Sequence, residues 1–164
     1  MFREMRRNRQ QLSHEESVKI LNKCSSGVLA LSGDDGYPYA VPMSYIYADG
    51  KIYFHSAKSG HKIDSVNREE KASFCVIDAD DVVPEEYTTY FRSVIAFGRI
   101  HILTDETEKR RTIELLAKKY YPGDTDEHRD MAIEKEYPPV CMLEMNIEHM
   151  TGKEAIELVS KIII

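Results

Sequence analysis

The sequence predicts an α+β fold in which antiparallel strands form a closed or half-closed β-barrel with helices around it. About six segments have the length and composition of strands, and many of them are apolar on both faces. Helical patterns do not alternate regularly with these strands, which disfavours a doubly wound parallel sheet. The chain has 164 residues, enough for one domain with a substantial core and too few for two. We therefore expect a single domain over residues 1–164.

The first third of the chain predicts a helix followed by three strands. Residues 1–12 are polar and basic, and we expect them to form a loose arm. Ser13 and Glu16 have the spacing of a capping box, and apolar residues at helical spacing then predict a helix over about 14–24. Two Asp-Gly turns join the following segments, so we expect an antiparallel meander of strands at about 27–31, 38–47 and 52–55.

The remaining elements follow from the same patterns. Gly98, inside a long apolar segment, is expected to mark a bulge or a bend at a barrel corner. Thr104 or Asp105 is expected to cap a helix with a core-facing apolar stripe. The predicted elements are a helix at about 60–68, a strand at 72–77, an acidic loop at 78–86, a β-rich segment at 87–103, helices at about 105–120 and 128–135, a last strand at about 140–147, and a C-terminal tail at 152–164.

Composition and charge exclude several classes of protein. The formal net charge of -6 argues against bulk binding to nucleic acid or anionic membranes, both of which require a basic surface. Cys24, Cys75 and Cys141 lie far apart and form no CxxC pair, so neither a disulfide framework nor a zinc ribbon is expected. The charged N-terminus lacks the apolar segment of a secretory signal, and no apolar run reaches the length of a membrane span. These features indicate a cytoplasmic protein with buried thiols.

Familiar catalytic and nucleotide-binding motifs are missing from the sequence. It contains no GxGxxG, no GxxxxGK[ST] and no HExxH. His55 and His61 could suggest a metal pair, but no carboxylate or cysteine ligand stands at a recognised spacing from them. We therefore expect no metal site.

The segment from His55 to Lys62 has the layout of an anion site. A strand ends in small residues, and a Gly-His-Lys step then opens a helix. Free N–H groups at a helix start, the helix dipole and a nearby ammonium all favour negative charge, so the segment predicts a phosphate cradle. The alternative is an ordinary connection between a strand and a helix, with a solvated lysine.

Two further segments are candidates for a pocket. Pro42 interrupts the strand at 38–47, and a proline there implies an edge, a bulge or an opening whose backbone groups can meet a flat ring. The tyrosines and Met43 beside it offer apolar walls, although an ordinary edge strand explains this segment, taken alone, more simply. Residues 85–95 are rich in tyrosine, threonine and arginine, which indicates a pocket wall, a dimer contact or a twisted surface hairpin.

These motifs, taken in order, resemble a known family. The ordered set is 27–30, then Asp35-Gly36-x-Pro38-Tyr39-x-Val41-Pro42-Met43-Ser44-Tyr45, then 52–57, Gly60-His61-Lys62, 73–76 and Ser93-Val94-Ile95-x-Phe97-Gly98-Arg99. It is similar to the flavin-nucleotide-binding proteins of the pyridoxamine 5'-phosphate oxidase-like superfamily, and most similar to the branch of 5-nitroimidazole resistance proteins. The resemblance covers residues 14–147.

The resemblance implies a split β-barrel that binds FMN at a homodimer interface. In this arrangement residues 42–44 run along the flavin ring, residues 55–57 lie near the ring edge and ribityl chain, and residues 60–62 hold the phosphate. Residues of the partner subunit complete the pocket. The cofactor-binding residues that it implies are Val41, Pro42, Met43, Ser44, His55, Ser56, Ala57, Gly60, His61 and Lys62, with Tyr90 and Ser93 on the partner's side. His55 is the positional match for a pocket histidine implicated in activity.

The sequence supports two functional hypotheses. The first is an FMN-dependent oxidoreductase, similar to a nitroimidazole reductase, that reduces a small electrophilic acceptor with His55 as the proton source. The second is a non-catalytic carrier or sensor that binds flavin or haem. Pyridoxamine phosphate oxidases place a phosphate-binding arginine on the second barrel strand, whereas 40–47 holds no arginine or lysine here. That departure argues against the oxidase activity itself.

Overall fold

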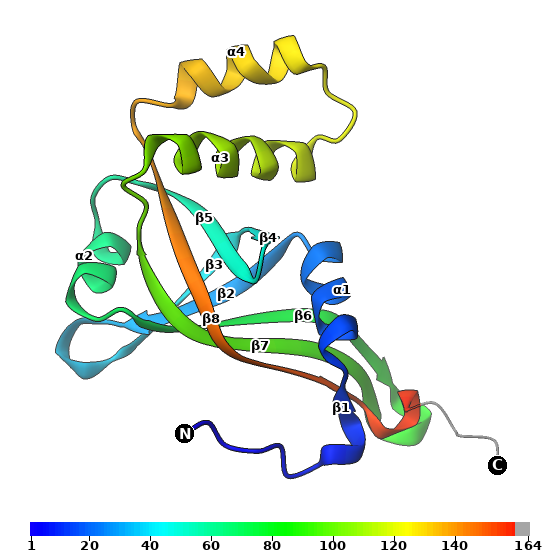
Figure 1. Ribbon diagram of the computed structural model, residues 1–164. Helices are drawn as coiled ribbons and strands as arrows, with labels where there is room; N and C mark the ends of the chain where they lie inside the picture. The colour runs from blue at the N-terminus through cyan, green and yellow to red at the C-terminus, as the bar shows by residue number, and fades with distance from the viewer. Residues whose placement is uncertain (160–164) are drawn as a thin grey trace.

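The computed structural model describes residues 1–159, which form one curved antiparallel sheet with helices packed around it (Figure 1). The helices are α1 (His14–Lys23), α2 (His61–Arg68), α3 (Glu106–Tyr120) and α4 (Asp126–Glu136). The strands are β1 (Gln11–Leu12), β2 (Ser26–Ser32), β3 (Pro38–Ser44), β4 (Ile46–Ala48), β5 (Lys51–Ala57), β6 (Lys71–Val83), β7 (Thr88–Ile102) and β8 (Val140–Glu154). Four short 3-10 helices, η1 to η4, cover Asn8–Gln10, Asp34–Gly36, Pro84–Glu86 and Ile156–Leu158.

The order of the strands shows a barrel that nearly closes on itself. The sheet runs β3-β2-β6-β7-β8-β5-β4, with β1 added to β8. Its two outermost strands, β3 and β4, are consecutive in the chain and meet at Tyr45. Tyr45 is fully buried, and its hydroxyl donates to the carbonyl oxygen of Leu21 at the end of α1 (2.7 Å). The α+β fold that the sequence predicts is therefore confirmed, as a split barrel.

Aromatic side chains fill the centre of the barrel. Tyr45 and Phe54 each contact Phe74 edge to face, with ring centroids 4.8 Å and 5.1 Å apart. All three side chains are fully buried. Edge-to-face packing adds about 1 kcal/mol per pair to the free energy gained by burial, so this cluster joins three different strand segments into one core.

The capping and turn chemistry is confirmed in detail. The Ser13 side chain accepts from the backbone N–H of Glu16, and the Glu16 carboxylate accepts from the backbone N–H of Ser13 (2.9 Å). Asp35 and Asp49 both adopt positive φ in the two Asp-Gly turns, which join β2 to β3 and β4 to β5. Pro42 lies in β3, an edge strand of the sheet order, as the proline predicts.

The predicted three-stranded meander is wrong in one respect. The single strand expected at 38–47 is split at Tyr45, so that β3 pairs with β2 and β4 pairs with β5. The two halves lie at opposite ends of the sheet order. The pattern of apolar residues in the sequence does not reveal this break, because Tyr45 is a large, buried aromatic residue of the kind that is common within strands.

Three predicted boundaries are also wrong, each because pairing extends a strand. The acidic segment expected as a loop at 78–86 continues β6 to Val83, paired with β7 from Ala79 onward after a register shift at Asp78. The last strand runs to Glu154 rather than 147, so Gly152 lies in β8 and not in a tail. The arm expected at 1–12 ends in β1, which pairs with β8. The rest of the expected tail, residues 160–164, lies outside the described residues.

Gly98 marks a bulge, as predicted. The register between β7 and β8 shifts between Phe97 and Gly98. A Cβ atom at Gly98 would overlap the carbonyl oxygen of Asn146 in β8, so the close approach of the two backbones requires glycine here.

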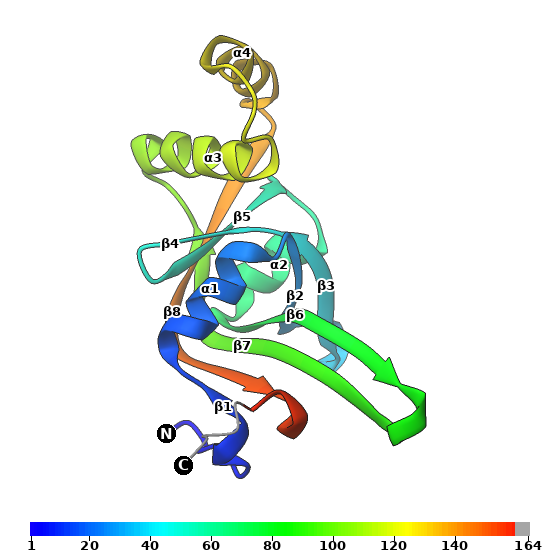
Figure 2. The same ribbon diagram turned by 90° about the vertical axis from the view of Figure 1, so that its right-hand side faces the viewer.

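Helices α3 and α4 form a hairpin at one end of the barrel, and β1 and η4 lie at the opposite end (Figures 1 and 2). Asp105 caps α3 by accepting from the N–H of Glu108 (2.8 Å), and Thr125 caps α4 in the same way. In the described chain, residues 1–159, no helix has both the length and the apolar character that crossing a bilayer requires.

Candidate functional site

The start of α2 is an open group of backbone donors. Gly60 occupies the N-cap with φ 118°, and no side chain caps the helix. A Cβ atom built at Gly60 has no heavy atom within 4 Å. The first N–H groups of α2 therefore lack a side-chain cap, and together with the helix dipole they favour a negatively charged group.

Lys62 adds a cation that has no acidic partner among residues 1–159. Its ammonium lies 3.3 Å from Sδ of Met43 in β3, a weak acceptor. Burial lowers the pKa of Lys62, and the Cys141 thiol opposes this shift. A half-buried ammonium beside free N–H groups is a donor set suited to a phosphate.

The end of β8 beside this cradle is electrostatically positive, although the chain as a whole is acidic. Cys141 pairs with Ser56 across β5 and β8, and its thiol lies 3.5 Å from the carbonyl oxygen of Ala57. Burial raises the pKa of the Cys141 thiol, and the ammonium groups of Lys109, Lys62 and Lys58 act to lower it. The positive charges of these three lysines therefore act on the Cys141 thiol at this end of the β5–β8 pair.

His55 projects from the exposed face of β5, opposite Met142 of β8. Desolvation by the surrounding protein lowers the pKa of His55, and the Lys62 ammonium lowers it further. The imidazole is therefore mainly neutral at pH 7 and can both accept and donate a proton.

His61 makes its contacts with the β2–β3 hairpin. Its ring stacks on Tyr39 at 4.0 Å with an interplanar angle of 16°, and Nε2 lies 3.7 Å from the carboxylate of Asp34. The side chain therefore ties the start of α2 to β3. The backbone N–H of His61 belongs to the cradle by its position at the first residue of α2.

Strand alternation divides the other predicted residues between two faces. In β3, Val41 and Met43 pack toward the core while Pro42 is exposed. In β5, Ser56 is buried and Ala57 is exposed beside His55. The structure thus brings Ser44 and His55 to one cavity wall, while Pro42 and Ala57 are exposed in the same two strands. Val41 and Ser56 can reach a ligand there only through their backbone groups.

Tyr90 and Ser93 lie apart from the cradle within one chain. Both are in β7, where Ser93 pairs with Ile77 of β6. The pairing of β6 with β2 ends earlier, at Cys75, so this part of β6 and β7 extends past β2. Figure 2 shows this end of the β6–β7 pair projecting from the barrel. The Tyr90 hydroxyl donates to Glu86 (2.7 Å) on the same projection.

A cavity of about 430 Å³ adjoins the face that carries His55, and sequence reasoning missed it. It lies between the α3–α4 hairpin and the ends of β3, β5 and β8. The residues that line it are Ser44, His55, Ile113, Leu116, Ala117, Tyr120, Tyr121, Asp124, His128, Arg129, Ala132, Ile133, Glu136, Tyr137 and Val140. The only sequence signal was the apolar stripe of α3, which has the same pattern as a stripe buried in a core.

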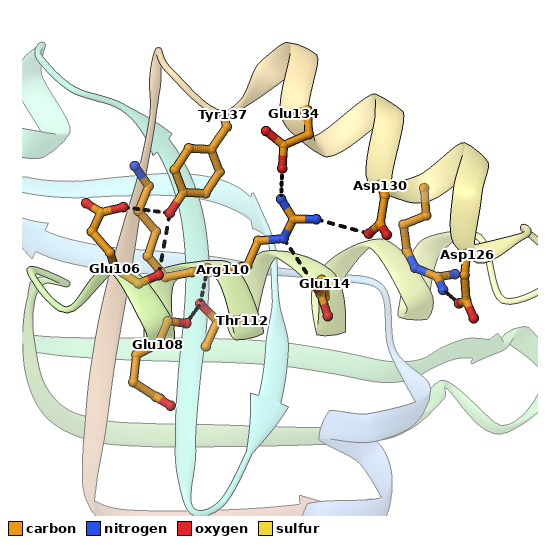
Figure 3. A network of polar contacts seen from close by, with 11 residues as sticks. Glu106, Glu108, Arg110, Thr112, Glu114, Asp126, Asp130, Glu134 and Tyr137 are labelled. Atoms are coloured by element: carbon orange, nitrogen blue, oxygen red, sulfur yellow. Dashed lines mark hydrogen bonds and ion pairs between the residues drawn. The ribbon is translucent and has the colours of Figure 1, made fainter.

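The α3–α4 hairpin is held together largely by polar contacts (Figure 3). Arg110 of α3 pairs with Glu114 on its own helix (2.9 Å), with Asp130 of α4 (3.0 Å) and with Glu134 of α4. The Tyr137 hydroxyl donates to the Glu106 carboxylate (2.6 Å). These contacts fix the outer side of the hairpin, which leaves the cavity open on its inner side.

Comparisons with known proteins concern the family and the fold. A family model described as pyridoxamine 5'-phosphate oxidase matches residues 13–154. None of the curated proteins matches the sequence significantly.

Solved structures share the fold at low sequence identity. A candidate 5-nitroimidazole antibiotic resistance protein from Bacteroides thetaiotaomicron is 22% identical with a TM-score of 0.73, and the match covers 88% of this chain and 86% of that chain. A conserved hypothetical protein from Mycobacterium tuberculosis is 21% identical with a TM-score of 0.82, covering 96% and 94%. A FAD-binding protein from Mesorhizobium loti is 26% identical with a TM-score of 0.66, covering 89% and 97%.

Proposed function

Because this chain belongs to the pyridoxamine 5'-phosphate oxidase family, whose split barrels include flavin-binding proteins, we propose that it binds FMN and reduces a small electrophilic acceptor. The observation that carries the proposal is the Lys62 ammonium. It is half-buried, it belongs to the second residue of the uncapped helix α2, and it has no carboxylate partner in the described part of the chain. A phosphate would supply the missing negative charge.

The size of the cradle favours FMN over FAD. One helix start and one ammonium match a single terminal phosphate, whereas FAD carries a diphosphate and an adenosine that need further partners. The flavin ring would then lie along the outer face of β3 and β5, against Pro42, Ser44 and His55. The M. loti protein binds FAD, so both nucleotides belong in the test.

A second copy of the chain completes this proposal. Val28, Cys75 and Ile95 lie side by side across β2, β6 and β7, on the outer face of the sheet. Ile77 and Phe97 extend this apolar row, and both are exposed in the single chain. A partner docked on the row would cover it. The partner would also bring its own Tyr90 and Ser93, from the projecting end of β7, toward the flavin face.

The chemistry of the bound flavin is two-electron transfer to an acceptor. His55 lies on the same outer face, and its lowered pKa keeps the ring mainly neutral at pH 7, so that it would exchange a proton with the acceptor as a neutral imidazole. Lys62 and the α2 amides fix the position of the flavin rather than take part in the transfer. A nitro compound is the first acceptor to try, in view of the resistance protein from B. thetaiotaomicron.

The substitution Lys62→Ala tests the cradle. A charge-assisted hydrogen bond contributes about 1.5–3 kcal/mol, so we expect FMN affinity to fall about 10- to 100-fold. Quenching of flavin fluorescence measures the affinity for FMN and FAD in parallel. Lys71→Ala, an exposed lysine at the start of β6, is the control and should leave affinity unchanged.

Three results would contradict the proposal: wild-type protein that binds no FMN, Lys62→Ala that binds FMN as tightly as wild type, or FAD bound more tightly than FMN. The reaction is tested on the same sample. Loss of flavin absorbance with a nicotinamide cofactor, and its return with a 5-nitroimidazole, identifies an oxidoreductase. Flavin that stays bound through both additions without a spectral change identifies a carrier.

A further inference from the structure

The cavity between the α3–α4 hairpin and the barrel has the size of a small-molecule site. Its volume of about 430 Å³ falls within the range of about 300–1,000 Å³ that is typical of ligand pockets. Ser44 and His55 form part of its wall. The cavity is therefore continuous with the face on which the flavin ring is proposed to lie.

Apolar side chains from three elements make up most of the wall. They are Ile113, Leu116 and Ala117 of α3, Ala132 and Ile133 of α4, and Val140 of β8. The aromatic rings of Tyr120, Tyr121 and Tyr137 complete it. A wall of this kind binds aromatic or aliphatic groups by removing their surface from water.

The basic groups of α4 at the cavity each contact an acidic side chain. Arg129 is almost fully buried and pairs with Asp126, and Nδ1 of His128 lies 2.7 Å from the carboxylate of Asp124. His55 is the remaining basic group of the wall and is mainly neutral at pH 7. Within residues 1–159, the permanent cation of the wall, Arg129, is thus already paired, and the acidic side chains Asp124 and Glu136 also line the cavity. An anionic ligand would lose its hydration and gain no partner.

We propose that this cavity binds the electron acceptor, and that the acceptor is a small uncharged molecule whose apolar body lies between α3 and α4 while one polar group faces Ser44 and His55. The inference rests on the proposed function, because it uses the flavin expected beside these two residues. It assigns the α3–α4 hairpin the role of selecting the acceptor.

The test compares two probes that share the nitrobenzene ring and differ in charge. Nitrobenzene is uncharged, and 4-nitrobenzoate carries one negative charge. Isothermal titration of wild-type protein, with and without FMN, should show nitrobenzene binding about tenfold or more tightly than 4-nitrobenzoate. This comparison needs no variant, so it remains decisive whatever a substitution does to folding.

A substitution then locates the site. Ala132 lines the cavity at an exposed position of α4, so Ala132→Phe places a ring in the cavity without disturbing the barrel core. We expect nitrobenzene affinity to fall about tenfold or more, while FMN affinity stays unchanged. Met131→Phe adds the same ring at the neighbouring position, where the side chain is 73% exposed and outside the cavity wall. That variant should bind both ligands as wild type does.

Equal binding of the two probes, or unchanged nitrobenzene binding by Ala132→Phe, would overturn the inference. So would a lower molar mass of Ala132→Phe in light scattering, because the cavity would then hold part of a second copy. Failure of the wild type to bind FMN, with nitrobenzene bound normally, would instead overturn the proposed function and with it the acceptor role.

Discussion

The barrel and the α3–α4 hairpin are held together by different forces. In the barrel, Tyr45, Phe54 and Phe74 are fully buried and pack edge to face. In the hairpin, Arg110 reaches two acidic side chains of α4 across the gap between the helices, and the inner apolar side chains line a cavity. The apolar core of the barrel is packed, whereas the apolar side chains of the hairpin include the buried Leu116 and Ile133 and also line a cavity.

This difference explains why the candidate site lies where the two regions meet. A packed core fixes the positions of the strands, and with them His55 and the start of α2, to within small displacements. A hairpin held by exposed ion pairs can adjust at low cost, because such pairs contribute little and are screened by salt. A rigid barrel face for the proposed flavin, beside an adjustable wall formed by the α3–α4 hairpin, suits a protein that holds its cofactor and exchanges its acceptor.

Truncating the barrel core should have the largest effect. Phe74→Ala removes a fully buried ring that contacts both Tyr45 and Phe54, so we expect the free energy of unfolding to fall by about 3–5 kcal/mol. Urea denaturation followed by circular dichroism measures the loss. The matched change in the hairpin region, Tyr121→Ala, removes a ring that is 58% exposed and should cost about 1 kcal/mol or less. Equal losses would show that the two regions share one core.

Removing the central cation of the hairpin should have a smaller and local effect. Arg110→Met leaves Glu114, Asp130 and Glu134 without their shared partner, and we expect a loss of about 1–2 kcal/mol in the stability of α4. Hydrogen exchange should show faster exchange in α4 and unchanged protection in β6 and β7.

The control for this variant is Arg68→Met, which breaks a comparable exposed pair with Asp34 (3.0 Å) on the barrel. It should leave α4 unchanged. Wild-type protein in 1 M salt should approach the exchange rates of Arg110→Met, because salt screens exposed pairs. Uniformly faster exchange in both regions of Arg110→Met would contradict the distinction drawn between them.

Local sequence chemistry predicted most of the barrel. The capping box at Ser13 and Glu16, the two Asp-Gly turns and the bulge at Gly98 each depend on a few neighbouring residues, and all were confirmed. The errors arose where distant pairing decides the outcome. β6 continues through an acidic segment because β7 supplies partners for its backbone, and the strand at 38–47 divides because its two halves pair with different neighbours.

The candidate site was predictable only where it is local. The cradle is a continuous segment, so the pattern from His55 to Lys62 could indicate it. The cavity is assembled from α3, α4 and three strands, and no spacing within one segment distinguishes a stripe that lines a cavity from a stripe that is buried. That Lys62 has no acidic partner among residues 1–159 is likewise a property of the folded chain, since carboxylates are plentiful in the sequence.

The smallest expected effect concerns Lys119, which joins the two regions. From α3 its ammonium donates to the carbonyl oxygens of Leu21 (3.3 Å) and Tyr45 (3.2 Å) and lies over the Tyr45 ring. Burial lowers the pKa of Lys119 to about 8, and Cys24 opposes this shift. Between about pH 8 and pH 10 the unfolded chain therefore holds a proton on this lysine that the folded chain has lost, so the Lys119 contribution to stability rises with pH in this window.

Replacing this lysine should remove that rise. Relative to Lys119→Met, wild-type protein should gain about 1 kcal/mol of stability from pH 8 to pH 10, less than the full pKa shift implies because the side chain keeps some contact with water. Urea denaturation at pH 8, 9 and 10 measures the difference.

Burial raises the pKa values of Tyr45 and Cys24, which lowers stability at the alkaline end in both proteins and largely cancels in the comparison. Lys118→Met, its exposed neighbour, should follow the wild-type curve. Parallel curves for wild type and Lys119→Met would mean that the ammonium is fully solvated, and that the hairpin rests on the barrel without a buried charge between them.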